Sequence, residues 1–189
     1  MARGWMTLAI VAALWGTTRA AEAQLSVGGH VGYGAGLNAH PDPYRALVGA
    51  RVGWNFEKIY LGANVNFFGG EKFSDRRDTA SFRQVQVLGL EAGYDVELGP
   101  VVLRPLFGLG GVVGIAKVAG RKENQGAAFV NFGAEALTVV KEVVFLGGGL
   151  RFISSFYDQN NINAFSFYGL AGVYLDVLHR KDDTKVSGE

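Results

Sequence analysis

The stretch VVLRPLFGLGGVVGIA, residues 101–116, decides between two kinds of fold for this chain. Its valines, leucines and phenylalanine favour a β-strand, and its glycines suit either a phosphate-binding turn or the strand itself. The dinucleotide fingerprint G-x-G-x-x-G requires a third glycine three positions after the second. Gly108 and Gly110 fit the first two places, but Val113 occupies the third, and no acidic residue follows about 20 positions later. We therefore interpret the stretch as a strand.

The same two-residue alternation of side chains extends along most of the chain. In residues 101–115 the odd positions are mainly apolar, and the even positions carry Arg104 and several glycines. Comparable alternation is found in residues 25–38, 44–56, 59–68, 127–137, 143–153 and 163–177. In residues 82–96 the apolar positions change phase between Val87 and Leu88, which predicts a β-bulge there. The pattern predicts eight strands.

The connections between these strands alternate in length. Those at 57–58, 98–100 and around 140–142 are short, whereas 69–81, 117–126 and 154–162 are long and polar, and 39–43 falls on the long side. Short turns at one end and long loops at the other are typical of an up-and-down barrel. The predicted fold class is all-β, an eight-stranded antiparallel up-and-down transmembrane β-barrel.

The volume of the side chains indicates which face of the strands points outward. An eight-stranded barrel is only wide enough for its own side chains, so the apolar face would overfill the interior of a soluble, lipocalin-like barrel. Placed outward, it forms an apolar belt, and the glycine-rich face leaves room for polar side chains inside. We also expect two aromatic girdles in this belt. The girdle residues are Tyr44, Phe67, Phe152 and Phe165 toward the loops, and Trp54, Phe56 and Tyr94 toward the turns.

Both ends of the chain differ from the alternating part. Residues 1–23 have the form of a secretory signal, with Arg3, an apolar stretch and an Ala-Glu-Ala cleavage site, so the barrel is predicted over 24–177 and a polar periplasmic tail over 178–189. Loss of this signal removes Arg3, Arg19 and Glu22 from the 18 basic and 17 acidic residues, which leaves the charges balanced. A balanced charge gives no footprint for nucleic acid. The chain has 28 glycines and no cysteine, so no disulfide can stabilise it.

The segment LRPLFGLGGVVG, residues 103–114, resembles the Pro-aromatic-Gly-x-Gly strand of the small outer-membrane β-barrel family, which includes the OmpA transmembrane domain and OmpX. The resemblance implies a monomer in the outer membrane of a Gram-negative cell, in contact with its lipid and lipopolysaccharide. It also implies recognition of the last strand by the barrel-assembly machinery, for which Gly172, Leu175 and Val177 have the expected spacing. The usual terminal aromatic residue is missing, and an OmpA-type tether to peptidoglycan is not expected.

Six charged residues on the glycine-rich face form the candidate site, and they share the interior with His30. They are Arg51, Glu91, Asp95, Arg104, Glu135 and Arg151. The short turn at 98–100 places Asp95 opposite Arg104 on neighbouring strands. Because an unpaired buried charge is very costly, we expect a network of salt bridges that fills the interior. The alternative hypothesis is a narrow small-solute pore lined by the same groups.

The predicted loops also carry residue types that occur in catalytic sites. His40, Ser74 and Asp75 lie in long-side loops and have the residue types of a base, a nucleophile and an orienting acid, as in a lipid A-modifying enzyme. No recognisable motif surrounds them, so we predict that the chain is not an enzyme. His30, His40 and His179 do not cluster, and neither a metal site nor a cofactor is expected.

The sequence therefore predicts an integral outer-membrane protein with a structural or interaction role. The loops at 72–78 and 121–124 would be presented to lipopolysaccharide or to other envelope proteins. A further alternative is a subunit of an envelope-spanning assembly, with the tail as a periplasmic handle.

Overall fold

The computed structural model describes residues 23–39, 42–71, 81–118, 121–140, 143–158 and 161–175. These ranges contain β1 (Ala23–Gly36), β2 (Ala46–Phe56), β3 (Ile59–Gly69), β4 (Ser81–Tyr94), β5 (Val96–Leu98), β6 (Val101–Val118), β7 (Arg121–Val140), β8 (Val144–Phe156) and β9 (Asn161–Leu175). No helix within these ranges is long and apolar enough to cross a membrane. The predicted signal segment, apart from Ala23, and the predicted tail lie outside the described residues.

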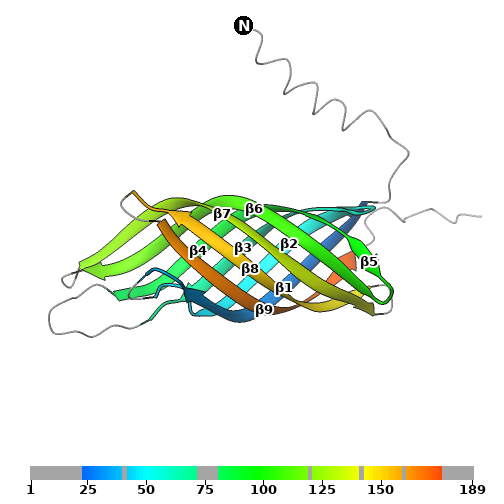
Figure 1. Ribbon diagram of the computed structural model, residues 1–189, viewed down its shortest axis with the longest axis horizontal. Helices are drawn as coiled ribbons and strands as arrows, with labels where there is room; N and C mark the ends of the chain where they lie inside the picture. Colours follow the sequence, from blue (N-terminus) through cyan, green and yellow to red (C-terminus); the bar gives the residue numbers. More distant parts are fainter. Residues whose placement is uncertain are drawn as a thin grey trace, which may run out of the picture.

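The strands form one closed antiparallel barrel (Figure 1). Their order is β4-β3-β2-β1-β9-β8-β7-β6-β5, and β4 pairs with β6 to close the sheet. β4 and β5 are two parts of one strand, interrupted at Asp95, and both pair with β6. The predicted eight-stranded up-and-down barrel is therefore confirmed.

The barrel has two distinct ends. At the turn end, residues 57–58, 99–100 and 141–143 connect neighbouring strands, and β1 begins and β9 finishes there. At the loop end, β1 is followed by β2, β3 by β4, β6 by β7 and β8 by β9.

The glycines of the 101–116 stretch belong to the strand β6, where Gly108 and Gly114 face the interior and Gly111 faces the outer surface. On β6, residues 104, 106, 108, 112 and 114 are buried, and residues 103, 105, 107, 109, 111 and 113 are exposed on the outer surface. A Cβ atom added at Gly110 would lie 2.1 Å from the backbone oxygen of Leu88 on β4. Glycine is required there because the neighbouring backbone approaches closely. These glycines are part of a strand, as predicted.

The predicted bulge at Val87–Leu88 is wrong. β4 alternates without a break at this point: Val85 and Val87 are buried in the interior, and Leu88 and Leu90 are exposed outside. The shift in pairing lies between Phe82 and Gln84 instead. The apparent change of phase arises because the interior itself is apolar near the loop end, so large apolar residues occupy both faces of β4.

The predicted loop at 117–126 is also wrong over most of its length. β6 continues to Val118 and β7 begins at Arg121, and the two strands stay paired in register to their ends. The predicted loop at 154–162 is shorter for the same reason, because β8 continues to Phe156 and β9 begins at Asn161. Polar residues above an apolar belt look like a loop in sequence, but here they extend the strands.

Candidate functional site

The interior of the barrel holds a network of ion pairs that connects strands on opposite sides. Arg51 on β2 donates through Nη1 to both carboxylate oxygens of Glu135 on β7, at 2.7 and 2.6 Å. Both side chains are almost completely buried. A pair in such a site needs further hydrogen bonds to offset the loss of water.

A second arginine from β8 joins two carboxylates of this network. Arg151 Nη2 lies 3.0 Å from Glu91 Oε2 and 3.8 Å from Glu135 Oε1. Tyr168 on β9 accepts a hydrogen bond from Arg151 at 3.1 Å and donates one to Glu135 at 2.8 Å. Glu135 is thus bound by groups from three other strands, which fixes its position.

The third pair lies nearer the turn end. Arg104 on β6 donates through Nε and Nη2 to the two oxygens of Asp95, at 2.5 and 2.8 Å, and through Nη2 to Asn55 at 2.8 Å. The guanidinium also lies 4.2 Å from the centre of the Tyr60 ring. The neighbouring strands place Asp95 beside Arg104, since Val96 pairs with Leu103.

Neutral side chains complete the hydrogen bonds of the network. Tyr60 and Asn64 donate to Glu91 at 3.0 and 2.8 Å, and Asn66 donates to Asn64 at 2.7 Å. His30 forms a hydrogen bond with the oxygen of Asn66. These neutral partners were not predicted, although Tyr60, Asn64 and Asn66 lie on the inward face of the alternating pattern. The described network pairs three arginines with three carboxylates, so its formal charge balances.

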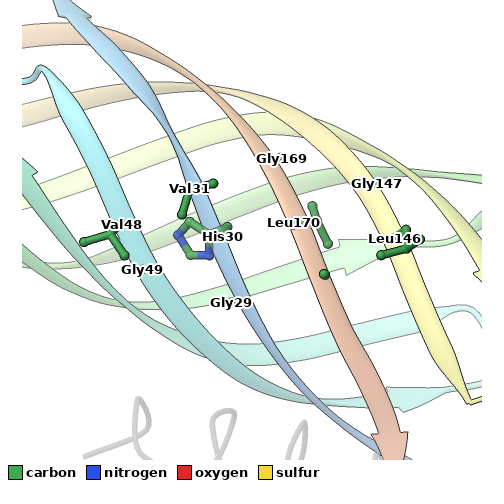
Figure 2. Close-up of a pocket in the computed structure, with 10 residues that line it drawn as sticks. Gly29, His30, Val31, Val48, Gly49, Leu146, Gly147, Gly169 and Leu170 are labelled. Carbon is green, nitrogen blue, oxygen red and sulfur yellow. The ribbon is translucent and has the colours of Figure 1, made fainter.

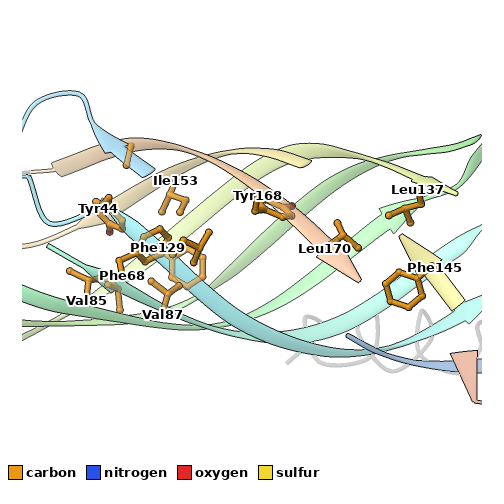
Figure 3. Close-up of a cluster of buried hydrophobic side chains, with 13 residues drawn as sticks. Tyr44, Phe68, Val85, Val87, Phe129, Leu137, Phe145, Ile153, Tyr168 and Leu170 are labelled. Carbon is orange, nitrogen blue, oxygen red and sulfur yellow. The ribbon is translucent and has the colours of Figure 1, made fainter. Parts of the chain in front are cut away.

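The interior near the loop end is filled with apolar side chains rather than charges. This apolar plug consists of Tyr44, Leu47, Phe68, Val85, Val87, Val112, Phe129, Ile153 and Ala164. The same buried cluster continues through Tyr168 toward the turn end, where it contains Leu137, Phe145 and Leu170. Figure 3 shows the rings of Tyr44, Phe68 and Phe129 gathered together on the loop side of Tyr168. Tyr44 and Phe68 meet edge to face at 4.9 Å, and the Tyr44 hydroxyl bonds Ser155 at 2.6 Å.

The plug contains Tyr44, which was predicted to lie outside, and the polar side chain of Tyr157 borders it. Tyr44 was predicted in the outer girdle, but it is only 1% exposed and lies inside. Beside it, burial raises the pKa of Tyr157 to about 12, so this hydroxyl stays protonated at neutral pH. The predicted girdle residues Phe67, Phe165, Trp54, Phe56 and Tyr94 are exposed on the outer surface, and Phe152 is partly exposed there.

The outer surface of the barrel is apolar and uneven. Phe107, Phe132, Phe152 and Phe165 are successive partners across β6, β7, β8 and β9, and they form one row around the wall. Elsewhere on the wall, small residues leave an open depression of about 570 Å³ over β2, β1, β9 and β8 (Figure 2). Gly29, Gly169 and Ala171 face outward there. The lining of the depression is mostly apolar.

Several of the residues predicted to have functional roles lie in segments that the structure does not describe. His40, Ser74, Asp75 and His179, and the loop at 72–78, lie outside the described residues. Residues 121–124 belong to β7, and Glu123 and Asn124 are exposed.

Comparison with known proteins identifies the fold. No protein-family model matches the sequence, and no curated protein matches it. The structure is similar to the crystal structure of Neisserial surface protein A, with 13% identity, a TM-score of 0.62, and coverage of 80% of this chain and 96% of that chain. A major outer membrane protein of Thermus thermophilus has 13% identity and a TM-score of 0.57, over 81% of this chain and 99% of that chain.

A third structure extends the same likeness. The N-terminal β-barrel domain of Pseudomonas aeruginosa OprF has 15% identity and a TM-score of 0.52, over 81% of this chain and 99% of that domain. The chain therefore has the fold of the small outer-membrane β-barrels, which confirms the predicted resemblance at the level of the fold.

Proposed function

We propose that this chain is an integral outer-membrane protein with a closed, filled interior, and that it serves as a structural or interaction protein rather than as a catalyst. The observation that carries this proposal is the inverted distribution of side chains. Large apolar residues such as Val31, Leu88 and Leu90 are exposed over the outer wall, while charged residues are buried inside. Water would disfavour such a surface, whereas a bilayer stabilises it.

The dimensions of the wall support the same proposal. β2 has 11 residues, which at about 3.3 Å each and about 40° of tilt span roughly 28 Å along the barrel axis. The apolar band of an outer-membrane barrel is about 25 Å tall. A closed sheet also leaves no unpaired backbone groups in the hydrocarbon region.

The contents of the interior favour a structural role over transport. The ion pairs lie in the middle and toward the turn end, together with buried Leu137, Phe145 and Leu170, and the apolar plug occupies the loop end. A conducting pore needs a continuous polar path, and the plug interrupts it. The surface that remains for recognition is the loop end, which would face outside the cell.

Cysteine labelling tests both the location and the orientation. The chain has no cysteine, so a single introduced cysteine is a unique label. We expect a membrane-impermeant maleimide to label Asn124→Cys on intact cells. The matched variant Lys58→Cys, in a turn at the opposite end, should be labelled only after the cells are broken.

Fractionation provides the decisive control. The wild-type chain should sediment with the outer membrane and dissolve only in detergent. Recovery as a soluble protein without detergent would refute the membrane assignment. Labelling of Lys58→Cys but not Asn124→Cys on intact cells would reverse the orientation.

A further inference from the structure

His30 is the one histidine within the described ranges, and it lies inside the barrel beside the ion-pair network. It is on β1, opposite Gly49 of β2 (Figure 2), and it is 5% exposed. The described network is balanced, with three arginines against three carboxylates. Histidine is the side chain whose charge ordinarily changes between about pH 5 and pH 8. A fall in pH within this range therefore acts on the interior through His30.

A chain of three hydrogen bonds connects His30 on β1 with Glu91 on β4. Asn64 donates through Nδ2 to Glu91 Oε2 at 2.8 Å, and Asn66 donates through Nδ2 to Asn64 Oδ1 at 2.7 Å. His30 Nε2 completes the chain at Asn66 Oδ1. Glu91 Oε2 also accepts a hydrogen bond from Arg151 at 3.0 Å. The chain therefore links His30 to an ion pair of the network.

Glu91 fixes the direction of every bond in this chain. An ionised carboxylate only accepts hydrogen bonds, so Asn64 presents its amide nitrogen to Glu91 and its oxygen to Asn66. Asn66 in turn presents its nitrogen to Asn64 and its oxygen to His30. An amide oxygen requires a donor, so His30 carries its proton on Nε2. In the neutral ring, Nδ1 is then the nitrogen at which a second proton would bind.

The bond between His30 and Asn66 occupies space that Gly49 leaves free. A Cβ atom added at Gly49 would clash with both His30 Nε2 and Asn66 Oδ1. The centre of the Tyr168 ring on β9 lies 5.3 Å from the centre of the imidazole ring. Packing against β2 and β9, together with the bond to β3, therefore sets the position of the ring.

The charges around His30 oppose a second proton on its ring. The groups that face it from the neighbouring strands are Arg51 on β2, Asn66 on β3, Glu91 on β4, Arg151 on β8 and Tyr168 on β9. Two of these groups are cations and one is a carboxylate, which already accepts hydrogen bonds from three side chains. An imidazolium would be a buried charge without a partner of its own, which is costly.

We propose that His30 is an acid-sensitive switch of the barrel interior: the neutral ring with its proton on Nε2 completes the network, and a second proton on Nδ1 destabilises it. The unfolded chain binds that proton near the ordinary histidine value of about 6.5, whereas the folded interior opposes it. The stability is therefore complete above about pH 6.5 and falls as the pH falls below it. This goes beyond the proposed function, because it concerns the interior and holds whichever end of the barrel faces outside.

Unfolding of the complete chain in lipid vesicles over a series of pH values tests the proposal. Denaturant unfolding is measured from about pH 8 to about pH 5 for the wild type and for His30→Gln, whose amide offers a donor but does not titrate. The ratio of the two unfolding constants, wild type over variant, removes what His40, His179 and the other shared groups contribute. This ratio should rise by up to about tenfold per pH unit below about pH 6.5, because the unfolded wild type binds one more proton.

Asn66→Asp provides a charge-compensated control. Its carboxylate replaces the amide oxygen beside His30 Nε2, so an imidazolium gains the partner that it lacks in the wild type. The folded barrel then binds a proton at this site at least as readily as the unfolded chain does. The acid-induced rise of the unfolding constant should therefore disappear or reverse. A rise equal to that of the wild type would overturn the proposal.

Nitrogen NMR of the imidazole ring gives a readout that does not depend on the stability of a His30 variant. His40→Gln and His179→Gln together leave His30 as the only labelled histidine of the barrel in lipid nanodiscs. At about pH 7.5 the ring should be neutral with its proton on Nε2. An imidazolium or a proton on Nδ1 at this pH would overturn the proposal, and so would parallel pH profiles of the wild type and His30→Gln. A chain that does not enter lipid would instead refute the proposed function.

Discussion

Arg51 and Glu135 form an ion pair across the full width of the barrel. In the closed sheet, three strands separate β2 from β7 in either direction, and the guanidinium still reaches both carboxylate oxygens at 2.7 and 2.6 Å. The pair therefore links opposite walls. Because Arg151 and Tyr168 also contact Glu135, this carboxylate is the centre of the network.

Replacement of Glu135 should therefore be strongly destabilising. Glu135→Gln leaves two buried arginines without their shared carboxylate, and loss of one partner of a buried pair costs about 3–5 kcal/mol. Denaturant unfolding of the barrel in lipid vesicles would measure the loss. Glu123→Gln on the exposed part of the same strand is the control and should leave stability unchanged. Equal stability of the two variants would contradict a network that supports the fold.

The interior should not conduct ions. The apolar plug removes the continuous polar path that a solute needs, although the charged network alone resembles the lining of a pore. Purified wild-type protein in planar bilayers should therefore give no stepwise conductance. Reproducible unitary steps from folded, monodisperse protein would favour the small-solute pore instead.

Two phenylalanines on β7 should differ in their contribution to stability. Phe129 is 1% exposed inside the plug, whereas Phe132 is 49% exposed on the outer wall. Phe129→Ala leaves a cavity in the interior and should cost about 3–5 kcal/mol. Phe132→Ala should cost clearly less, because acyl chains fill the space that the ring leaves. Vesicle unfolding of both variants is the measurement, and a larger loss for Phe132→Ala would contradict the assignment of the faces.

The difference between the two faces of the strands is what makes the fold predictable from the sequence. A period of two residues indicates an all-β wall with different surroundings on each side, and the volume of the larger face indicates which side is outside. The contact between Asp95 and Arg104 follows from one short turn. The contact between Arg51 and Glu135 does not, because it depends on the stagger of all the strands around the barrel.

The incorrect predictions share one physical cause. Alternation distinguishes the faces only where one face is apolar and the other is not. Val85, Val87 and Tyr44 lie inside an apolar plug, so their hydrophobicity suggested the outer face. Residues 121–126 lie beyond the apolar belt, where both faces of a strand are polar, and they therefore suggested a loop.

The neighbouring glycines of the 101–116 stretch should respond oppositely to substitution. A Cβ atom at Gly110 would lie 2.1 Å from the Leu88 oxygen and 2.7 Å from the Gly89 Cα atom, both in the backbone, so Gly110→Ala forces the wall apart. Overpacking of this kind costs about 1–3 kcal/mol. A Cβ atom at Gly111 meets nothing within 4 Å on the outer surface. Gly111→Ala should be neutral or stabilise the strand by about 0.5–1 kcal/mol, because alanine loses less backbone entropy than glycine. Unfolding of both variants in lipid vesicles compares them directly. Tolerance of Gly110→Ala together with a loss for Gly111→Ala would mean that the glycines face the opposite way, and the assignment of wall and interior would fail with it.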